Sequence, residues 1–133
     1  LNCHEKEDKG GILMVHFYNE IKRMGNFLDE INLKAKKVED SGVFMEETFM
    51  NLQEAKARLI KGRTMIHTFS KEKFDGVLKE GFEILEKEKK VVGEGFKEVS
   101  KRRKGLAIFS IFALLLAILI LLKIKDIERG KNG

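Results

Sequence analysis

The chain contains no proline and no tryptophan, and its 133 residues include one cysteine and one tyrosine. Without proline, glycine is the main residue able to interrupt a helix, so the composition favours long helices over a turn-rich sheet. A single cysteine excludes an internal disulfide. The 26 basic and 21 acidic residues are interleaved along the chain. Because they form no basic stripe with aromatic support, we expect no nucleic-acid partner.

One long apolar run, GLAIFSIFALLLAILILL at residues 105–122, contains no charged residue. As a helix it would be about 27 Å long, close to the roughly 30 Å hydrocarbon core of a bilayer. A chain of this size could not bury a helix that is apolar on every side. We therefore predict a single transmembrane helix over 105–124 and a short tail over 125–133. Basic residues flank the run on both sides, so charge alone does not predict its orientation.

Three amphipathic segments precede this run, and their apolar residues recur in steps of three and four, as in a coiled-coil seam. The seam residues are Phe17, Ile21, Met24, Leu28, Ile31, Ala35 and Val38, then Met45, Phe49, Leu52, Ala55, Leu59, Gly62 and Ile66, then Phe74, Leu78, Gly81, Leu85, Val92, Phe96 and Val99. Ser41-Gly42 ends the first segment, and Ser70 is a candidate N-cap for the third. The fold prediction is all-α: an antiparallel three-helix bundle, coiled-coil-like, as an ectodomain over 12–104. Its third helix should continue into the transmembrane helix, with Gly93, Gly95 and Gly105 as weak points where it could kink.

This layout gathers the three histidines and the cysteine at one end. Pairing the first two helices across a turn near residues 40–44 opposes positions whose numbers total about 83, which places His16 opposite His67. Cys3 and His4 lie on the lead-in at the same end. Taken singly, His67 is typical of a helix end, His16 of a half-buried face and Cys3 of a free thiol. Their convergence instead favours a ligand site.

Cys3-His4 matches the end of C-x-x-C-H, the attachment motif of c-type haem, with its first cysteine absent from the chain. An electron-transfer haem needs two axial ligands, and imidazole can supply both. His4 would then be the proximal iron ligand, and His67 or His16 the distal one. Two alternatives stay open: a zinc site of all four residues, and a Cys–His nucleophile, for which no oxyanion hole or pocket is indicated. We rank haem first, zinc second and hydrolytic chemistry last.

The stretch LQEAKARLIKGRTMIHTFS, followed by KEGFEILEKEK, resembles the C-terminal region of membrane-anchored multihaem c-type cytochromes. The KRRKGL entry to the apolar run and its LLKIKDIE exit resemble that region too, and Cys3-His4, His16 and the IHTF around His67 carry the match. The resemblance implies haem c bound through a Cys3 thioether, with the second cysteine outside this chain.

The same resemblance implies an ectodomain on the periplasmic or extracytoplasmic side and a cytoplasmic tail. The implied partners are membrane lipid, upstream haem domains of the same protein and redox proteins. Because the chain begins at Leu1, we expect a fragment cut just after the first haem cysteine, with residues 1–11 as the remnant of the attachment segment.

The predicted function is therefore electron transfer, as the C-terminal part of a membrane-tethered multihaem cytochrome c. Control over the iron would act through axial ligation, hydrogen bonds to imidazole and solvent exposure. The alternative is a non-catalytic, membrane-anchored helical scaffold or sensor without a cofactor, which the heptads and the apolar run fit equally well.

Overall fold

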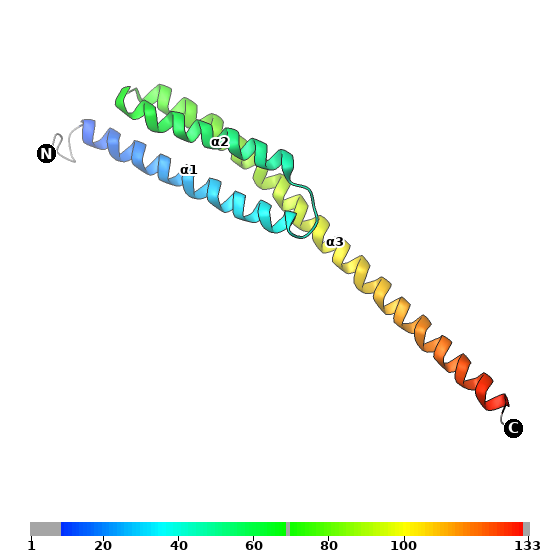
Figure 1. Cartoon of the computed structure of the whole chain (residues 1–133). Helices are drawn as coiled ribbons and strands as arrows, with labels where there is room; N and C mark the ends of the chain where they lie inside the picture. Colours follow the sequence, from blue (N-terminus) through cyan, green and yellow to red (C-terminus); the bar gives the residue numbers. More distant parts are fainter. Residues whose placement is uncertain (1–8, 69, 132–133) are drawn as a thin grey trace. The chain divides into compact units, whose positions relative to one another are not determined.

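The protein is all-α in a computed structural model that describes residues 9–68 and 70–131 (Figure 1). Within these residues, three α-helices follow one another, and a short 3₁₀ helix separates the last two. They are α1 (Lys9–Glu39), α2 (Glu46–Met65), η1 (Ile66–Thr68) and α3 (Lys71–Lys131). No strand occurs within the two described ranges, so the all-α prediction is confirmed. α1 begins three residues before the predicted start of the bundle at residue 12, and residues 1–8 lie outside the described part.

The chain divides into two compact units, one ending at Phe96 and the other beginning at Lys97. α3 contributes to both, and its 61 residues form one uninterrupted helix. None of the three glycines marked as weak points ends or breaks it. The prediction that the third helix continues through the apolar run is therefore confirmed.

The turn after α1 ends the helix in the way that its glycine predicts. Gly42 has a φ of 84°, which a residue without Cβ adopts at little cost. The N–H of Val43 donates to the carbonyl of Val38 at 3.4 Å, and the N–H of Gly42 donates to that of Glu39 at 2.8 Å. This pair of bonds is the Schellman motif, which satisfies carbonyl groups left without partners at the end of a helix.

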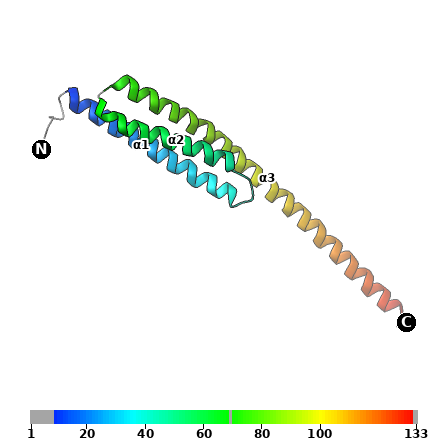
Figure 2. The same cartoon turned by 45° about the horizontal axis from the view of Figure 1, so that its top comes forward.

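In the first unit, α1, α2 and the beginning of α3 lie side by side in both views (Figures 1 and 2). The rings of Phe17 and Phe74 pack with their centroids 4.2 Å apart. Two glycines of α3 give close approaches to α1, and three of the pairs that contact each other between these helices differ by 57 in residue number. These pairs are Phe17–Phe74, Met24–Gly81 and Val38–Gly95. α1 and α3 thus keep one register over three heptads.

The buried side chains of the first unit follow the predicted seams closely. They include Phe17, Met24, Leu28, Ile31, Ala35, Val38, Met45, Leu52, Ala55, Leu59, Phe74, Leu78, Leu85 and Val92. Phe96 differs from the prediction, because 41% of it is exposed. The seam passes instead through Gly95, where Val38 and Met45 would both contact an added Cβ. A large side chain does not fit at that level of α3.

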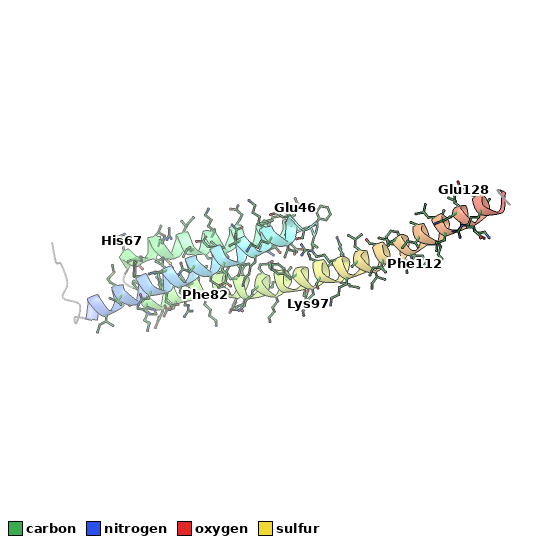
Figure 3. The ribbon with its side chains drawn as sticks, turned by 90° about the horizontal axis from the view of Figure 1, so that it is seen from below. Glu46, His67, Phe82, Lys97, Phe112 and Glu128 are labelled. Carbon is green, nitrogen blue, oxygen red and sulfur yellow. The ribbon has the colours of Figure 1, made fainter. Side chains whose placement is uncertain are left out.

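In the second unit, α3 carries an 18-residue window with a mean hydropathy of 3.0, and none of that window is buried. Phe112 lies in this stretch (Figure 3). The hydroxyl of Ser110 donates to the carbonyl of Leu106 at 2.8 Å, so this polar side chain is satisfied within the helix. By length and composition the segment could cross a membrane.

Candidate functional site

His16 is the predicted ligand with the most contacts in the described chain. Its Nε2 lies 2.8 Å from Oδ1 of Asp75, which joins α1 to α3. The imidazole also packs edge-on against Phe74 with ring centroids 6.2 Å apart, and it is tilted 6.0 Å from Phe17. The His16 and Asp75 side chains are both part-exposed. The seam places the two aromatic rings inside and leaves this polar pair at its edge.

This geometry limits how His16 could bind a metal. Ligating histidines usually give their second ring nitrogen to a carboxylate, which fixes the tautomer. With Nε2 against Asp75, a metal would have to bind Nδ1. Ligation through Nε2 would require the Asp75 bond to break.

His67 lies in η1, directly after α2, and its side chain is exposed (Figure 3). The interactions of His16 within the described ranges are with α1 and α3 neighbours, and none involves His67. No group of three or more His, Cys, Asp or Glu side chains that could hold a metal occurs among the described residues. Cys3 and His4 lie outside those residues. Their predicted roles as thioether and proximal ligand, and the four-residue zinc set, stay predictions.

The surface beside His16 is a cleft between α1 and α3 with charged walls. Residues Glu20, Arg23, Lys79 and Phe82 line it together with the His16–Asp75 pair. Arg23 is engaged twice, in an ion pair with Glu20 at 3.2 Å and over the Phe82 ring at 4.5 Å. Arg23 therefore connects the α1 wall of this open cleft to its α3 wall through the Phe82 ring.

Sequence reasoning missed the most buried polar contact between helices. Glu88 of α3 is only 1% exposed, and its Oε1 accepts a hydrogen bond of 2.7 Å from Nδ2 of Asn51 on α2. A buried carboxyl group needs such a partner, because an unpaired one is strongly disfavoured. The signal was present in the heptads: the interval between Leu85 and Val92 is a full seven residues, and the seam position between them is 88.

One ion pair at the surface, between Glu30 and Lys34, changes the pKa of a carboxyl group. The hydrogen bond and charge of Lys34 lower the pKa of the Glu30 carboxyl. The two side chains are one helical turn apart on α1, the spacing at which a glutamate and a later lysine stabilise a helix. This pair is exposed and contributes to the helix surface, with no sign of a site.

Comparison of the chain with protein-family models, with curated proteins and with solved structures found no match. The resemblance to multihaem cytochromes therefore stays a prediction from the residues quoted for it.

Proposed function

We propose that this chain is a non-catalytic, membrane-anchored helical bundle that scaffolds or senses at a membrane. One observation carries the proposal: α3 leads from a unit with a buried heptad seam into a charge-free run whose side chains are all exposed. An exposed apolar helix of that length is unfavourable in water and favourable in a bilayer. In this proposal the buried heptad residues form the core of a folded domain, and the apolar run anchors that domain in the membrane.

Within this proposal the first unit is an antiparallel three-helix bundle. Three contacts support it by their residue numbers. Opposed residues of two antiparallel helices have residue numbers with a constant total. Gly25 of α1 lies beside Leu59 of α2, and their numbers total 84, close to the expected 83. Between α2 and α3, Gly62 lies beside Leu78 and Asn51 binds Glu88. The residue numbers of these two pairs total 140 and 139, so they agree with each other in the same way. Up-down neighbours joined by short turns have this pattern.

The test of the anchor is extraction of membranes at alkaline pH. The parent chain should remain in the membrane pellet, and a variant carrying Leu114→Lys and Ile118→Lys should move to the supernatant. Each lysine near the centre of a span costs about 2.5–3.5 kcal/mol for insertion. The matched control carries the same replacements at two exposed apolar positions of the first unit, Leu33→Lys and Ile60→Lys. It should stay in the pellet; a parent chain in the supernatant would refute the proposal.

The orientation in this proposal is an extracytoplasmic ectodomain over 12–104 and a cytoplasmic tail over 125–133. It rests on the resemblance, since both flanks of the run are basic. Labelling of Cys3 by a membrane-impermeant maleimide in intact cells tests it. If Cys3 were labelled only after permeabilisation, the ectodomain would lie in the cytoplasm and the proposed orientation would be wrong.

A second candidate function is electron transfer by covalently bound haem c, favoured by the Cys3-His4 dipeptide at the lead-in. His4 would be the proximal ligand and His67 or His16 the distal one, with His16 using Nδ1 or releasing Asp75. Upstream haem domains and redox proteins would be its partners, and bound haem would supply the electron chemistry.

Reading the codon before Leu1 decides between the two candidates. A cysteine codon there would complete C-L-N-C-H, and a covalent haem spectrum from the longer protein would confirm the cytochrome. In that protein, His67→Ala should lower the reduction potential or open the sixth position. An unchanged low-spin spectrum would leave His16 as the distal ligand, and any other codon would leave the scaffold.

A further inference from the structure

Four consecutive basic residues stand directly before the apolar run. Lys101, Arg102, Arg103 and Lys104 all belong to α3, in the second unit, and all are exposed. Successive residues of an α-helix are turned by about 100° from one another, so four of them cover its whole circumference. These residues, named here the basic collar, therefore surround the helix with positive charge on every side.

The charges near the collar leave most of its positive charge uncompensated. Arg102 Nε donates to Glu98 Oε1 at 2.9 Å, which engages one member. No acidic residue lies between Ser100 and the apolar run. The other end of the run differs, because its four basic residues, at 123, 125, 129 and 131, are accompanied by two acidic residues, at 126 and 128. The two flanks have similar numbers of basic residues and unequal net charge.

We propose that the basic collar binds the headgroups of anionic phospholipids in the leaflet where the apolar run enters the membrane. The inference rests on the proposed membrane anchor. Long basic side chains lay their apolar stems along the membrane boundary and extend their charges to the headgroups. Arginine can bind a phosphate through two parallel N–H bonds.

The choice of anionic lipid follows from charge and from position. Every phospholipid carries a phosphate, but only anionic headgroups keep a net negative charge to meet the collar. Each basic residue close to such a surface strengthens binding, typically by about fivefold at ordinary ionic strength. Because the collar encircles the helix, lipids on all sides of the span can contact it. The mixed charges of the other flank predict a weaker preference there.

A tryptophan introduced at the collar end of the run can measure this preference. The chain has no tryptophan of its own, so Leu106→Trp gives a unique reporter. The full chain is reconstituted in vesicles of equal parts phosphatidylcholine and phosphatidylglycerol. In one preparation only the phosphatidylcholine is brominated, and in the other only the phosphatidylglycerol. The ratio of the two quenching efficiencies gives the relative association of each lipid with the helix at this level.

The collar variant removes three charges and leaves the Glu98–Arg102 pair in place. The control variant removes three charges from the other flank. They are K101Q/R103Q/K104Q and K123Q/K125Q/R129Q, each in the Leu106→Trp background.

In the parent reporter, brominated phosphatidylglycerol should quench the more strongly, with a relative association constant about threefold to tenfold in its favour. The collar variant should bring this ratio close to one, and the control variant should keep it. Equal quenching by the two lipids in the parent, or a preference that survives in the collar variant, would overturn the collar proposal while leaving the anchor intact. No quenching by either lipid would show that the run is outside the bilayer, which would overturn the anchor and the collar together.

Discussion

Replacing Gly95 by alanine should destabilise the first unit, although the same replacement two residues earlier, at Gly93, should stabilise it. Both glycines lie within α3. A Cβ added at Gly95 would lie 2.6 Å from Cγ1 of Val38 and 2.8 Å from Cε of Met45. A Cβ added at Gly93 would meet nothing within 4 Å. The pair therefore separates helix propensity from packing at nearly the same place in the helix.

The magnitudes follow from two opposing effects. Alanine is better than glycine inside a helix by about 0.8–1 kcal/mol, and both variants gain this. At Gly95 the two neighbouring side chains must retreat by nearly 1 Å to reach ordinary contact at about 3.5 Å. Met45 can turn its flexible end away, but Val38 is β-branched and stiff in a helix. Overpacking of this kind costs about 1–3 kcal/mol. We expect Gly95→Ala to be less stable than Gly93→Ala by about 1–3 kcal/mol.

The assay is urea unfolding of the full chain in nonionic micelles, followed by circular dichroism at 222 nm. A partial rescue identifies the cause: Val38→Ala should be less costly in the Gly95→Ala background than alone, by about 1 kcal/mol or more. If Gly95→Ala and Gly93→Ala proved equally stabilising, α1 would not pack on α3 at this level. The register assigned to these two helices would then be refuted.

Two further predictions concern polar groups. Asn51→Ala should destabilise the first unit by about 1–3 kcal/mol in urea unfolding at neutral pH, because the buried Glu88 carboxyl loses its hydrogen-bond donor. Glu88→Leu, alone or with Asn51→Leu, should be less harmful or even stabilising, and a Glu88→Leu loss equal to that of Asn51→Ala would argue against burial of the carboxyl. At the surface, the lowered pKa of Glu30 means that its ion pair contributes stability above the ordinary glutamate pKa, and that this contribution is lost as pH falls through the lowered value. Unfolding curves of Glu30→Gln and the parent should therefore differ slightly at pH 7 and converge in acid or at high salt, whereas a difference that persists in acid would contradict the assignment.

Periodicity alone predicted the helices and most of the interior. Steps of three and four placed Phe17, Leu52 and Leu85 on buried faces, and all three are buried. Ser41-Gly42 predicted the end of the first helix because glycine accepts the positive φ that the turn requires. Such signals are local, and a single sequence carries them fully.

Partners far apart in the chain could not be predicted in the same way. His16 and Asp75 are 59 residues apart, and their bond depends on the register of α1 against α3. Periodicity fixes which face of a helix is buried but leaves open which heptad lies opposite which. The predicted seam likewise named no residue between Leu85 and Val92, because a glutamate such as Glu88 can be buried there only where a partner, here Asn51, lies opposite it. Cys3, the predicted thioether residue, and His4, the predicted proximal iron ligand, lie outside the described part of the chain.

The register of α1 against α3 is set by residues that break the apolar pattern. At successive heptads α1 presents Phe17, Met24, Ile31 and Val38, and α3 presents Phe74, Gly81, Glu88 and Gly95. With an offset of 57 the two phenylalanine rings pack against each other at an interplanar angle of 40°, and two side chains of α1 fill the spaces left by the two glycines. The same offset brings Glu88 to the level of Ile31, where Asn51 supplies its hydrogen bond. A slip of one heptad would set Phe74 against Met24 and carry the Glu88 carboxyl toward Val38. Because the slipped pairing loses both the fit at glycine and the His16–Asp75 contact between α1 and α3, small and polar residues specify this packing more sharply than the leucines do.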